Sequence, residues 1–276
     1  MRTFKLINND GTEFDLTVTE SLAFLHSVSG LGYEKSDTYK NVGDTYVQTK
    51  TSFKQPLIKG TVALSDQQKY EELVRFCQIT PLKLKYEPIE RSVFYCRGVV
   101  SKIEYDEKKQ NAVDLTFSPW TPFYKTVSVT TYPDEAEVTG KVYDYTYPFV
   151  YNSATVNSVI LNLDSALESP CKLTLYGRLT NPEWRHYVNG RLFATGKIIA
   201  DIEQGNRLVI DTTNGDLSMK VYNPNNEEVR DMYQASDFST KRAIYLQRGQ
   251  NQIAVSDDNS NKTIVIAEGE FRYASV

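Results

Sequence analysis

Apolar and polar residues alternate with a period of two over most of the first part of the chain. The segment FKLI, the turn NNDG and the segment EFDLTV together predict a β-hairpin at its start. The alternation returns in PLIKGTVAL, in SVFYCRGVVSKIEY and in VDLTF. A period of two places every second side chain on the same face of a strand, so these segments predict a half-buried sheet.

One segment, residues 66–78, has a helical period instead. Its apolar residues recur at i, i+3, i+4 and i+7, and they are Tyr70, Leu73, Val74 and Cys77. We expect Ser65 to be the N-cap, Gln68 to complete a capping box and Pro81 to lie just beyond the end. The pattern therefore predicts one helix packed on the first sheet.

Residues 33–50 carry few apolar residues for their length, but they carry tyrosines six or seven residues apart: Tyr33, Tyr39 and Tyr46. A strand inside one domain would show an apolar face, so this segment predicts a projecting arm or edge ribbon. An uncovered sheet edge is a hazard that soluble monomers avoid. We therefore expect another molecule to cover the arm.

The segment VDLTFSPWTPFYK ends a strand at two proline dipeptides that are interspersed with aromatic residues. We expect Pro119, Trp120 and Phe123 to close a first domain over residues 1–124, with the aromatic rings packed at its seam with a second domain. Residues 125–147 are poor in core residues and are interpreted as a linker.

Residues 148–276 predict a second β domain. About eight short apolar segments are separated by turn sequences such as NPEW, VNGR, TNGD and NPNN, and no clear helical pattern occurs among them. This arrangement is typical of an antiparallel sandwich such as a jelly roll. The predicted fold class is therefore mainly β, in two domains.

Composition narrows the function. The formal net charge of -4 argues against affinity of the whole molecule for nucleic acid or an anionic membrane. No apolar run approaches the roughly 18 residues of a membrane span, and the first residues show no secretory leader. The three cysteines are far apart and odd in number, which predicts buried thiols in a protein made in a reducing cytosol.

The sequence shows no motif for catalysis or for a cofactor. His26 and His186 lie in apolar or aromatic segments and are interpreted as structural. Zinc-protease, paired-cysteine, phosphate-loop and nucleophile-elbow patterns are all missing from the sequence. We therefore predict a protein that is not an enzyme and uses no metal or cofactor.

The segment NPEWRHYVNGR is the best binding candidate that the residues offer. Trp184 and Tyr187 could stack on a sugar ring while Arg185 donates hydrogen bonds. The competing interpretation is a core tryptophan on a strand that follows a turn, and we favour it over a glycan site.

The order of these elements resembles a known family, the distal tail proteins of long, non-contractile phage tails. The likeness rests on SGLGYEKSDTY after an N-terminal hairpin, on LIKGTVALSDQQKYEELVRFCQITPLKLKY and on VDLTFSPWTPFY. In the second half it rests on LYGRLTNPEW, NRLVIDT, VYNPNNEEV and LQRGQNQIAVS. It covers nearly the whole chain, although no single motif in it is sharp.

The resemblance implies a structural hub at the virion tail tip, made in the host bacterial cytoplasm. An N-terminal β-sandwich with one helix and a projecting ribbon would form a ring of six copies, with the three arm tyrosines at the contact between copies. The ring would join the tail tube protein above to a tail-tip protein below, and DNA would pass through it without specific binding. The C-terminal domain would be a galectin-like or carbohydrate-module-like sandwich, often a docking platform for receptor-binding proteins.

Two other functions remain open at this point. The second sandwich could itself grip cell-wall sugar, which would make the chain a carbohydrate-binding or receptor-binding protein. An enzyme that acts on cell-wall polymer is disfavoured by the two histidines and the missing motifs.

Overall fold

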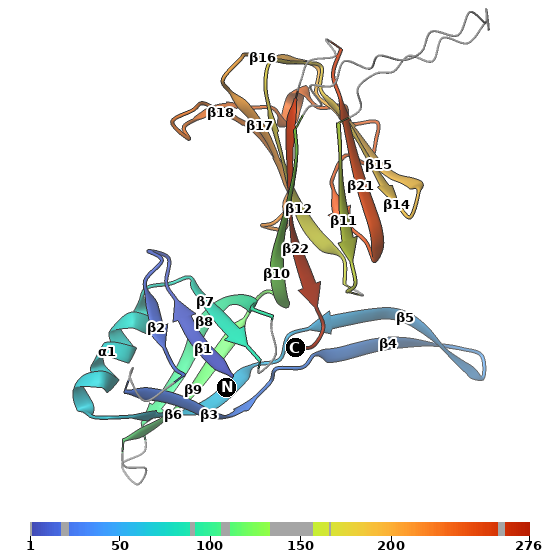
Figure 1. The fold of residues 1–276 in the computed structure, drawn as a ribbon. Helices are drawn as coiled ribbons and strands as arrows, with labels where there is room; N and C mark the ends of the chain where they lie inside the picture. The colour runs from blue at the N-terminus through green and yellow to red at the C-terminus, as the bar shows by residue number, and fades with distance from the viewer. Residues whose placement is uncertain are drawn as a thin grey trace, which may run out of the picture. The chain divides into compact units, whose positions relative to one another are not determined.

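The computed structural model describes residues 2–17, 22–88, 92–105, 111–132, 157–165, 167–258 and 263–276. The chain divides into two compact units (Figure 1). Unit 1 contains Met1–Lys125 and Arg272–Val276, and unit 2 contains Thr126–Phe271. The regular secondary structure of the described residues is almost entirely β-strand, which confirms the predicted fold class. They contain no helix long and apolar enough to cross a membrane.

Unit 1 is built on antiparallel strands that pair in the order β3-β6-β9-β8-β7-β1-β2. Their bounds are β1 Thr3–Ile7, β2 Glu13–Asp15, β3 Ala23–Ser29, β6 Ile58–Leu64, β7 Leu82–Glu87, β8 Phe94–Tyr105 and β9 Ala112–Pro119. Every second residue is buried along most of these strands, as the alternation predicts. The buried side chains form one apolar cluster enclosed by the strands.

The single helix, α1 (Gln67–Gln78), packs on this cluster through Leu73 and Cys77. Its N-cap is Asp66 and not Ser65, because a carboxylate oxygen of Asp66 accepts a hydrogen bond of 2.8 Å from the backbone N–H of Lys69. Ser65 donates to the other carboxylate oxygen of Asp66. Ser65 is therefore not the N-cap that the sequence predicts, but it holds the side chain of the N-cap residue in place.

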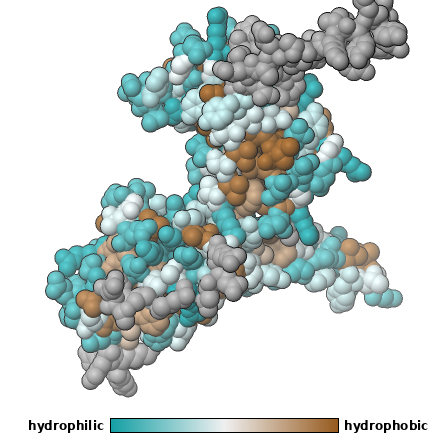
Figure 2. Space-filling model, in the orientation of Figure 1, coloured by the Kyte–Doolittle hydropathy of each residue, from teal (hydrophilic) through white to brown (hydrophobic). Residues whose placement is uncertain are grey.

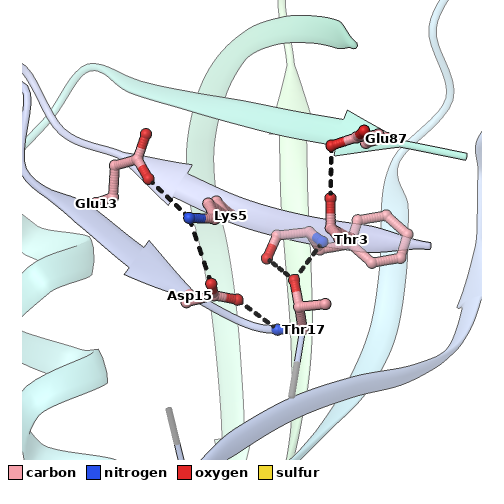
Figure 3. A network of polar contacts seen from close by, with 7 residues as sticks. Thr3, Lys5, Glu13, Asp15, Thr17 and Glu87 are labelled. Carbon is pink, nitrogen blue, oxygen red and sulfur yellow. Dashed lines mark hydrogen bonds and ion pairs between the residues drawn. The ribbon is translucent and has the colours of Figure 1, made fainter. Parts of the chain in front are cut away.

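A small polar network closes the edge of unit 1 beside β2 (Figure 3). The hydroxyl of Thr17 accepts from the backbone N–H of Phe4 at 2.9 Å and donates to the backbone oxygen of the same residue at 3.0 Å. Lys5 lies between the carboxylates of Glu13 and Asp15, at 3.0 and 3.4 Å. Thr17 thus satisfies buried backbone groups, whereas the partly exposed ion pairs contribute little to stability.

Two long strands leave unit 1 as a hairpin, which we call the arm: β4 (Glu34–Val42) and β5 (Thr45–Lys54). They pair only with each other among the described residues and form a two-stranded sheet. Nearly all of their residues are exposed. Figure 2 shows a mostly hydrophilic arm with a small hydrophobic patch near its free end. The predicted arm is confirmed as an element, and it extends to Lys54.

Unit 2 is a sandwich of two antiparallel sheets. The first sheet has the order β19-β18-β17-β12-β22-β10, and the second has the order β11-β21-β14-β15. The first contains β10 Phe123–Thr131, β12 Ser169–Tyr176, β17 Arg207–Asp211, β18 Ser218–Tyr222, β19 Glu228–Asp231 and β22 Ile264–Tyr273. The second contains β11 Asn157–Leu163, β14 Glu183–Val188, β15 Arg191–Lys197 and β21 Gly249–Ser256.

Short elements complete unit 2. They are β13 Leu179–Thr180, β16 Asp201–Ile202, β20 Tyr245–Leu246 and the 3-10 helix η1 Tyr233–Ala235. Alternate residues of both sheets are buried, among them Leu173 and Ile210 from the first sheet and Leu161 and Ile253 from the second. The antiparallel sandwich expected for the second domain is therefore present.

The unit boundaries differ from the expected domains at two points. The expected linker begins at residue 125, yet the alternating segment FYKTVSVTT forms β10 as far as Thr131. Residues 133–156 lie outside the described part, so the rest of the expected linker is not tested. The last five residues belong to unit 1 and not to the second domain. Tyr273 meets Phe94 edge to face at 5.3 Å, and Lys125 lies 5.0 Å from the Tyr273 ring.

The three cysteines are free and buried, as predicted. Burial raises the pKa of Cys77 and of Cys96 to about 12, and it also raises the pKa of Cys171. Thiolates are the reactive form, so these thiols are inert packing groups at neutral pH.

Candidate functional surfaces

The arm has two chemically different faces. The register pairs Lys35 with Phe53, Tyr39 with Gln48 and Asn41 with Tyr46, and side chains directly opposite each other lie on one face. Tyr33 joins this face through its ring contact with Phe53 at 5.5 Å. We call this surface the tyrosine face, and its aromatic residues are Tyr33, Tyr39, Tyr46 and Phe53. The opposite surface, the lysine face, carries Lys40, Lys50 and Lys54.

A β-bulge brings the aromatic residues onto one face. Tyr46 and Phe53 are seven residues apart, and an odd separation in a regular strand puts two side chains on opposite faces. The register shifts between Thr38 and Tyr39, which leaves Thr49 of β5 as the extra residue. The hydroxyl of Thr49 donates to the backbone oxygen of Thr38 at 3.0 Å and holds the bulge.

The tyrosine face is ordered by its own polar contacts. Lys35 and Asp37 form an ion pair of 2.9 Å, and Thr51 donates to Asp37 at 2.8 Å. The hydrogen bond between Lys35 and Asp37 is the main cause that raises the pKa of Lys35, and it is also the main cause that lowers the pKa of Asp37. The rings beside these groups remain open to solvent, with exposed fractions of 51% for Tyr33, 56% for Tyr39 and 75% for Tyr46. The arm thus presents a patterned surface with no cover in this chain among the described residues.

The base of the arm is fixed to unit 1. The side-chain amide of Gln55 donates to the backbone oxygens of Gly30 and Gly32, at 2.7 and 2.6 Å. Gly30 has a φ of +88°, and a Cβ there would lie 2.2 Å from the backbone oxygen of Leu57. Only glycine fits such a position, so the chain leaves the sheet there in a defined direction.

The proline-aromatic cluster is only partly buried, and the expected plug is wrong for its tryptophan. Phe123 is fully buried in unit 1, where its ring lies 6.2 Å from that of Tyr86. Trp120 is 57% exposed, because its backbone pairs with Arg97 while its ring points outwards. Pro119 lies opposite Gly98 at the end of β9. Phe123 therefore closes the core of unit 1 without Trp120.

The sugar-stacking interpretation of Trp184 is also wrong. Its side chain has no exposed surface, its ring N–H donates to the backbone oxygen of Arg242 at 3.0 Å, and a Cβ on Gly196 would lie 2.1 Å from its ring. Arg185 and Tyr187 alternate with it along β14 and lie on the outer side, where Arg185 pairs with Glu183 at 2.6 Å. The three residues form no common site, and Trp184 is a core residue.

His186 is a structural histidine, as expected. It is fully buried, and its Nε2 lies 3.0 Å from the side-chain oxygen of Asn251. Burial lowers its pKa more than the contact with Asn251 raises it. Among the described residues, no three or more histidine, cysteine, aspartate or glutamate side chains gather closely enough to hold a metal ion.

A groove of about 480 Å³ on the outer face of the first sheet of unit 2 was missed by the sequence interpretation. We call it the sheet groove, and three rows of side chains across neighbouring strands line it. One row is Tyr222, Arg207 and Tyr176; the next is Val209, Thr174 and Ile266; the third is Asp211, Lys172 and Glu268. The alternating polar and aromatic residues of CKLTLY and NRLVID indicate which side chains point outwards. That these side chains line up in rows follows only from the order of the strands in the sheet, which the sequence does not show.

Comparison with known proteins places the fold. Residues 3–118 match the family model described as distal tail protein, N-terminal domain. A comparison with curated protein sequences found no match. Two of the solved structures that are similar over nearly the whole chain come from phages. One is from the baseplate of phage P2 in its activated conformation with Ca, at a TM-score of 0.63 and 16% identity, covering 100% of each chain.

The other is the Dit protein of phage SPP1, which is described as a hub of the adsorption apparatus in phages that infect Gram-positive bacteria. Its TM-score is 0.64 and its identity 13%, covering 97% of this chain and 98% of the other. At these identities the similarity establishes a shared fold for the two units.

Proposed function

We propose that the chain, whose residues 3–118 match the N-terminal domain of the distal tail proteins of phages, is the structural hub that closes a ring of six copies at the end of a long, non-contractile tail. The ring joins the tail tube protein above to a tail-tip protein below, and DNA passes through it. Unit 2 serves as the docking platform for receptor-binding proteins or other parts of the tip. The protein acts in the virion by assembly and not by catalysis.

The observation that carries the proposal is the tyrosine face of the arm. Tyrosine covers a large area with few rotatable bonds and keeps a polar tip, so it is favoured at interfaces. In this arm it stands on a two-stranded sheet that has no second layer among the described residues. A neighbouring copy that packs on this face supplies the missing layer. A contact that gives a stable ring buries more than about 1,000 Å² between two copies.

The fixed root of the arm supports the proposal of a closed ring. A head-to-tail contact joins two different surfaces and closes only when the rotation per copy is fixed. Gln55 and Gly30 fix the direction in which the arm leaves unit 1, and the bulge at Thr49 fixes which side chains share a face. The net charge of -4 supports a wall along which DNA slides, because tight binding would need many cationic contacts to phosphates.

The test is the mass of the protein in solution, measured by light scattering over a concentration series. We expect the natural protein to self-associate and the double variant Tyr39→Ser with Tyr46→Ser to remain a monomer. The matched control, Lys40→Ser with Lys50→Ser, changes two residues on the lysine face and should retain the association. A tyrosine variant that associates like the natural protein would contradict the proposal, as would incorporation of both variants into tails with equal efficiency.

A further inference from the structure

We propose that the sheet groove of unit 2 binds an uncharged saccharide. This inference does not rest on the ring, because every residue in it belongs to unit 2. It also differs from the site on β14 that the sequence suggested, since the groove lies on the other sheet. Its volume of about 480 Å³ falls within the range of about 300–1,000 Å³ that is typical of small-molecule sites.

The rows give the groove a floor and two polar walls. Side chains two residues apart on a strand lie on the same face, and neighbouring strands are about 4.8 Å apart. Thr174 therefore lies in the middle of the floor, between Val209 and Ile266. Tyr176 stands at one end of β12 on this face, with an exposed fraction of 36%, and Lys172 stands at the other. A sugar ring has an apolar face and a polar rim, which match an aromatic ring beside a short apolar floor with donors and acceptors around it.

The polar side chains of the groove are held in place before any ligand binds. The Arg207 guanidinium lies 5.2 Å from the centre of the Tyr222 ring and donates to the backbone oxygen of Asn223 at 3.1 Å and to the side chain of Asn226 at 2.7 Å. Ordered side chains lose little conformational entropy when a ligand arrives, so an arranged groove binds more tightly than a mobile one.

The opposite wall is ordered in the same way. Lys172 and Glu268 form an ion pair of 3.0 Å across β12 and β22. The carboxylate of Asp211, on the other flank of Lys172, accepts at 2.7 Å from both the backbone N–H and the hydroxyl of Thr213. The carboxylates and the ammonium group thus offer acceptors and donors at fixed positions, which is the pattern that sugar hydroxyls can satisfy together.

The charges of the lining decide the class of ligand. Two cations, Lys172 and Arg207, face two carboxylates, Asp211 and Glu268, so the formal charges of the lining cancel. A phosphate or a polyanionic cell-wall polymer would meet both carboxylates and gain little from the paired lysine. An uncharged polyol meets no such repulsion, and it can use both signs as hydrogen-bond partners.

The experiment uses the full chain and a panel of uncharged mono- and disaccharides that includes glucose, galactose, rhamnose and N-acetylglucosamine. Saturation-transfer NMR detects binding, and a titration gives the dissociation constant. We expect at least one sugar to bind and Tyr176→Ala to weaken its binding by at least about tenfold, because stacking of the sugar on the aromatic ring is lost. Glu268→Gln should weaken the binding less, because an amide keeps one acceptor.

Tyr187→Ala is the matched control, because it removes a partly exposed tyrosine from the other sheet of the same sandwich. It should leave the dissociation constant unchanged, and circular dichroism should show both tyrosine variants folded. Loss of binding in Tyr187→Ala but not in Tyr176→Ala would overturn the inference. So would the absence of binding to every sugar of the panel, or binding of only charged glycans that disappears when salt is added.

Discussion

In the sandwich of unit 2, β14 sends Trp184 and His186 into a core and Arg185 outwards, whereas β4 and β5 of the arm send no side chain into a core. Both regions use the same period of two. In the sandwich the period separates buried from exposed residues, so burial of apolar area stabilises it. In the arm the period separates two exposed faces, one aromatic and one cationic. The difference shows that alternation in the arm buries little apolar area within the subunit and therefore contributes little to folding.

The largest effect is expected from truncation of the buried tryptophan. Trp184→Ala leaves a cavity against Gly196 and an unpaired backbone oxygen at Arg242, so it should lower the free energy of unfolding of unit 2 by about 3–5 kcal/mol. Tyr46→Ala, at the most exposed of the arm tyrosines, should change it by less than about 0.5 kcal/mol. Urea unfolding followed by circular dichroism checks both values. An equal loss of unfolding free energy in the two variants would contradict the view that the sandwich is stabilised by burial and the arm is not.

A smaller effect is expected from acid, and it should be confined to unit 2. The folded state lowers the pKa of His186 below its ordinary value of 6.5, so below that pH the unfolded chain binds more protons than the folded chain. The contribution of this group to stability is therefore complete above about pH 6.5 and is lost as the pH falls through the region below it. Urea unfolding at about pH 7.5 and about pH 5.5 measures the change.

His186→Gln should reduce the difference in stability between the two pH values, because it removes a group whose pKa is lower in the folded chain than in the unfolded chain. His26→Gln is the control, since it removes the other histidine from a partly exposed position in unit 1. A difference between the two pH values that persists in full in His186→Gln would contradict this account.

The smallest effect on stability should come with a clear effect on assembly. Exchanging two neighbours, Tyr46→Val with Val47→Tyr, keeps the composition of the arm but moves one tyrosine from the tyrosine face to the lysine face. Both positions are exposed, so we expect a change of less than about 0.5 kcal/mol in unfolding and a loss of self-association in light scattering. Val47→Tyr alone keeps Tyr46 in place and should retain the association. Unchanged association in the exchange variant would show that the face does not matter.

Much of the fold followed from local patterns in the sequence. The helix face was predicted because Leu73 and Cys77 recur at helical spacing, and the arm was predicted because its apolar content is too low for a core strand. The N-cap was misplaced by one residue, because Ser65 and Asp66 are both good caps and only the hydrogen bond to Lys69 distinguishes them.

The surfaces were predicted less well, for two physical reasons. Each face of the segment EWRHYV carries an aromatic residue, Trp184 on one face and Tyr187 on the other. The pattern therefore does not decide which of the two points inwards. The sheet groove joins residues of β12, β17, β18 and β22, and no spacing along the chain brings these strands together. The bulge at Thr49 is equally hidden, because one extra residue leaves the composition of a strand unchanged.

The return of residues 272–276 to unit 1 sets an order of events during translation. The C-terminus lies close to the root of the arm (Figure 1). The backbone N–H of Val276 bonds to the backbone oxygen of Leu31, and both side chains pack on the core of unit 1. The ribosome makes these residues only after all of unit 2 has been synthesised. A nascent chain that already contains the arm therefore cannot complete the root of the arm until the second sandwich has been made.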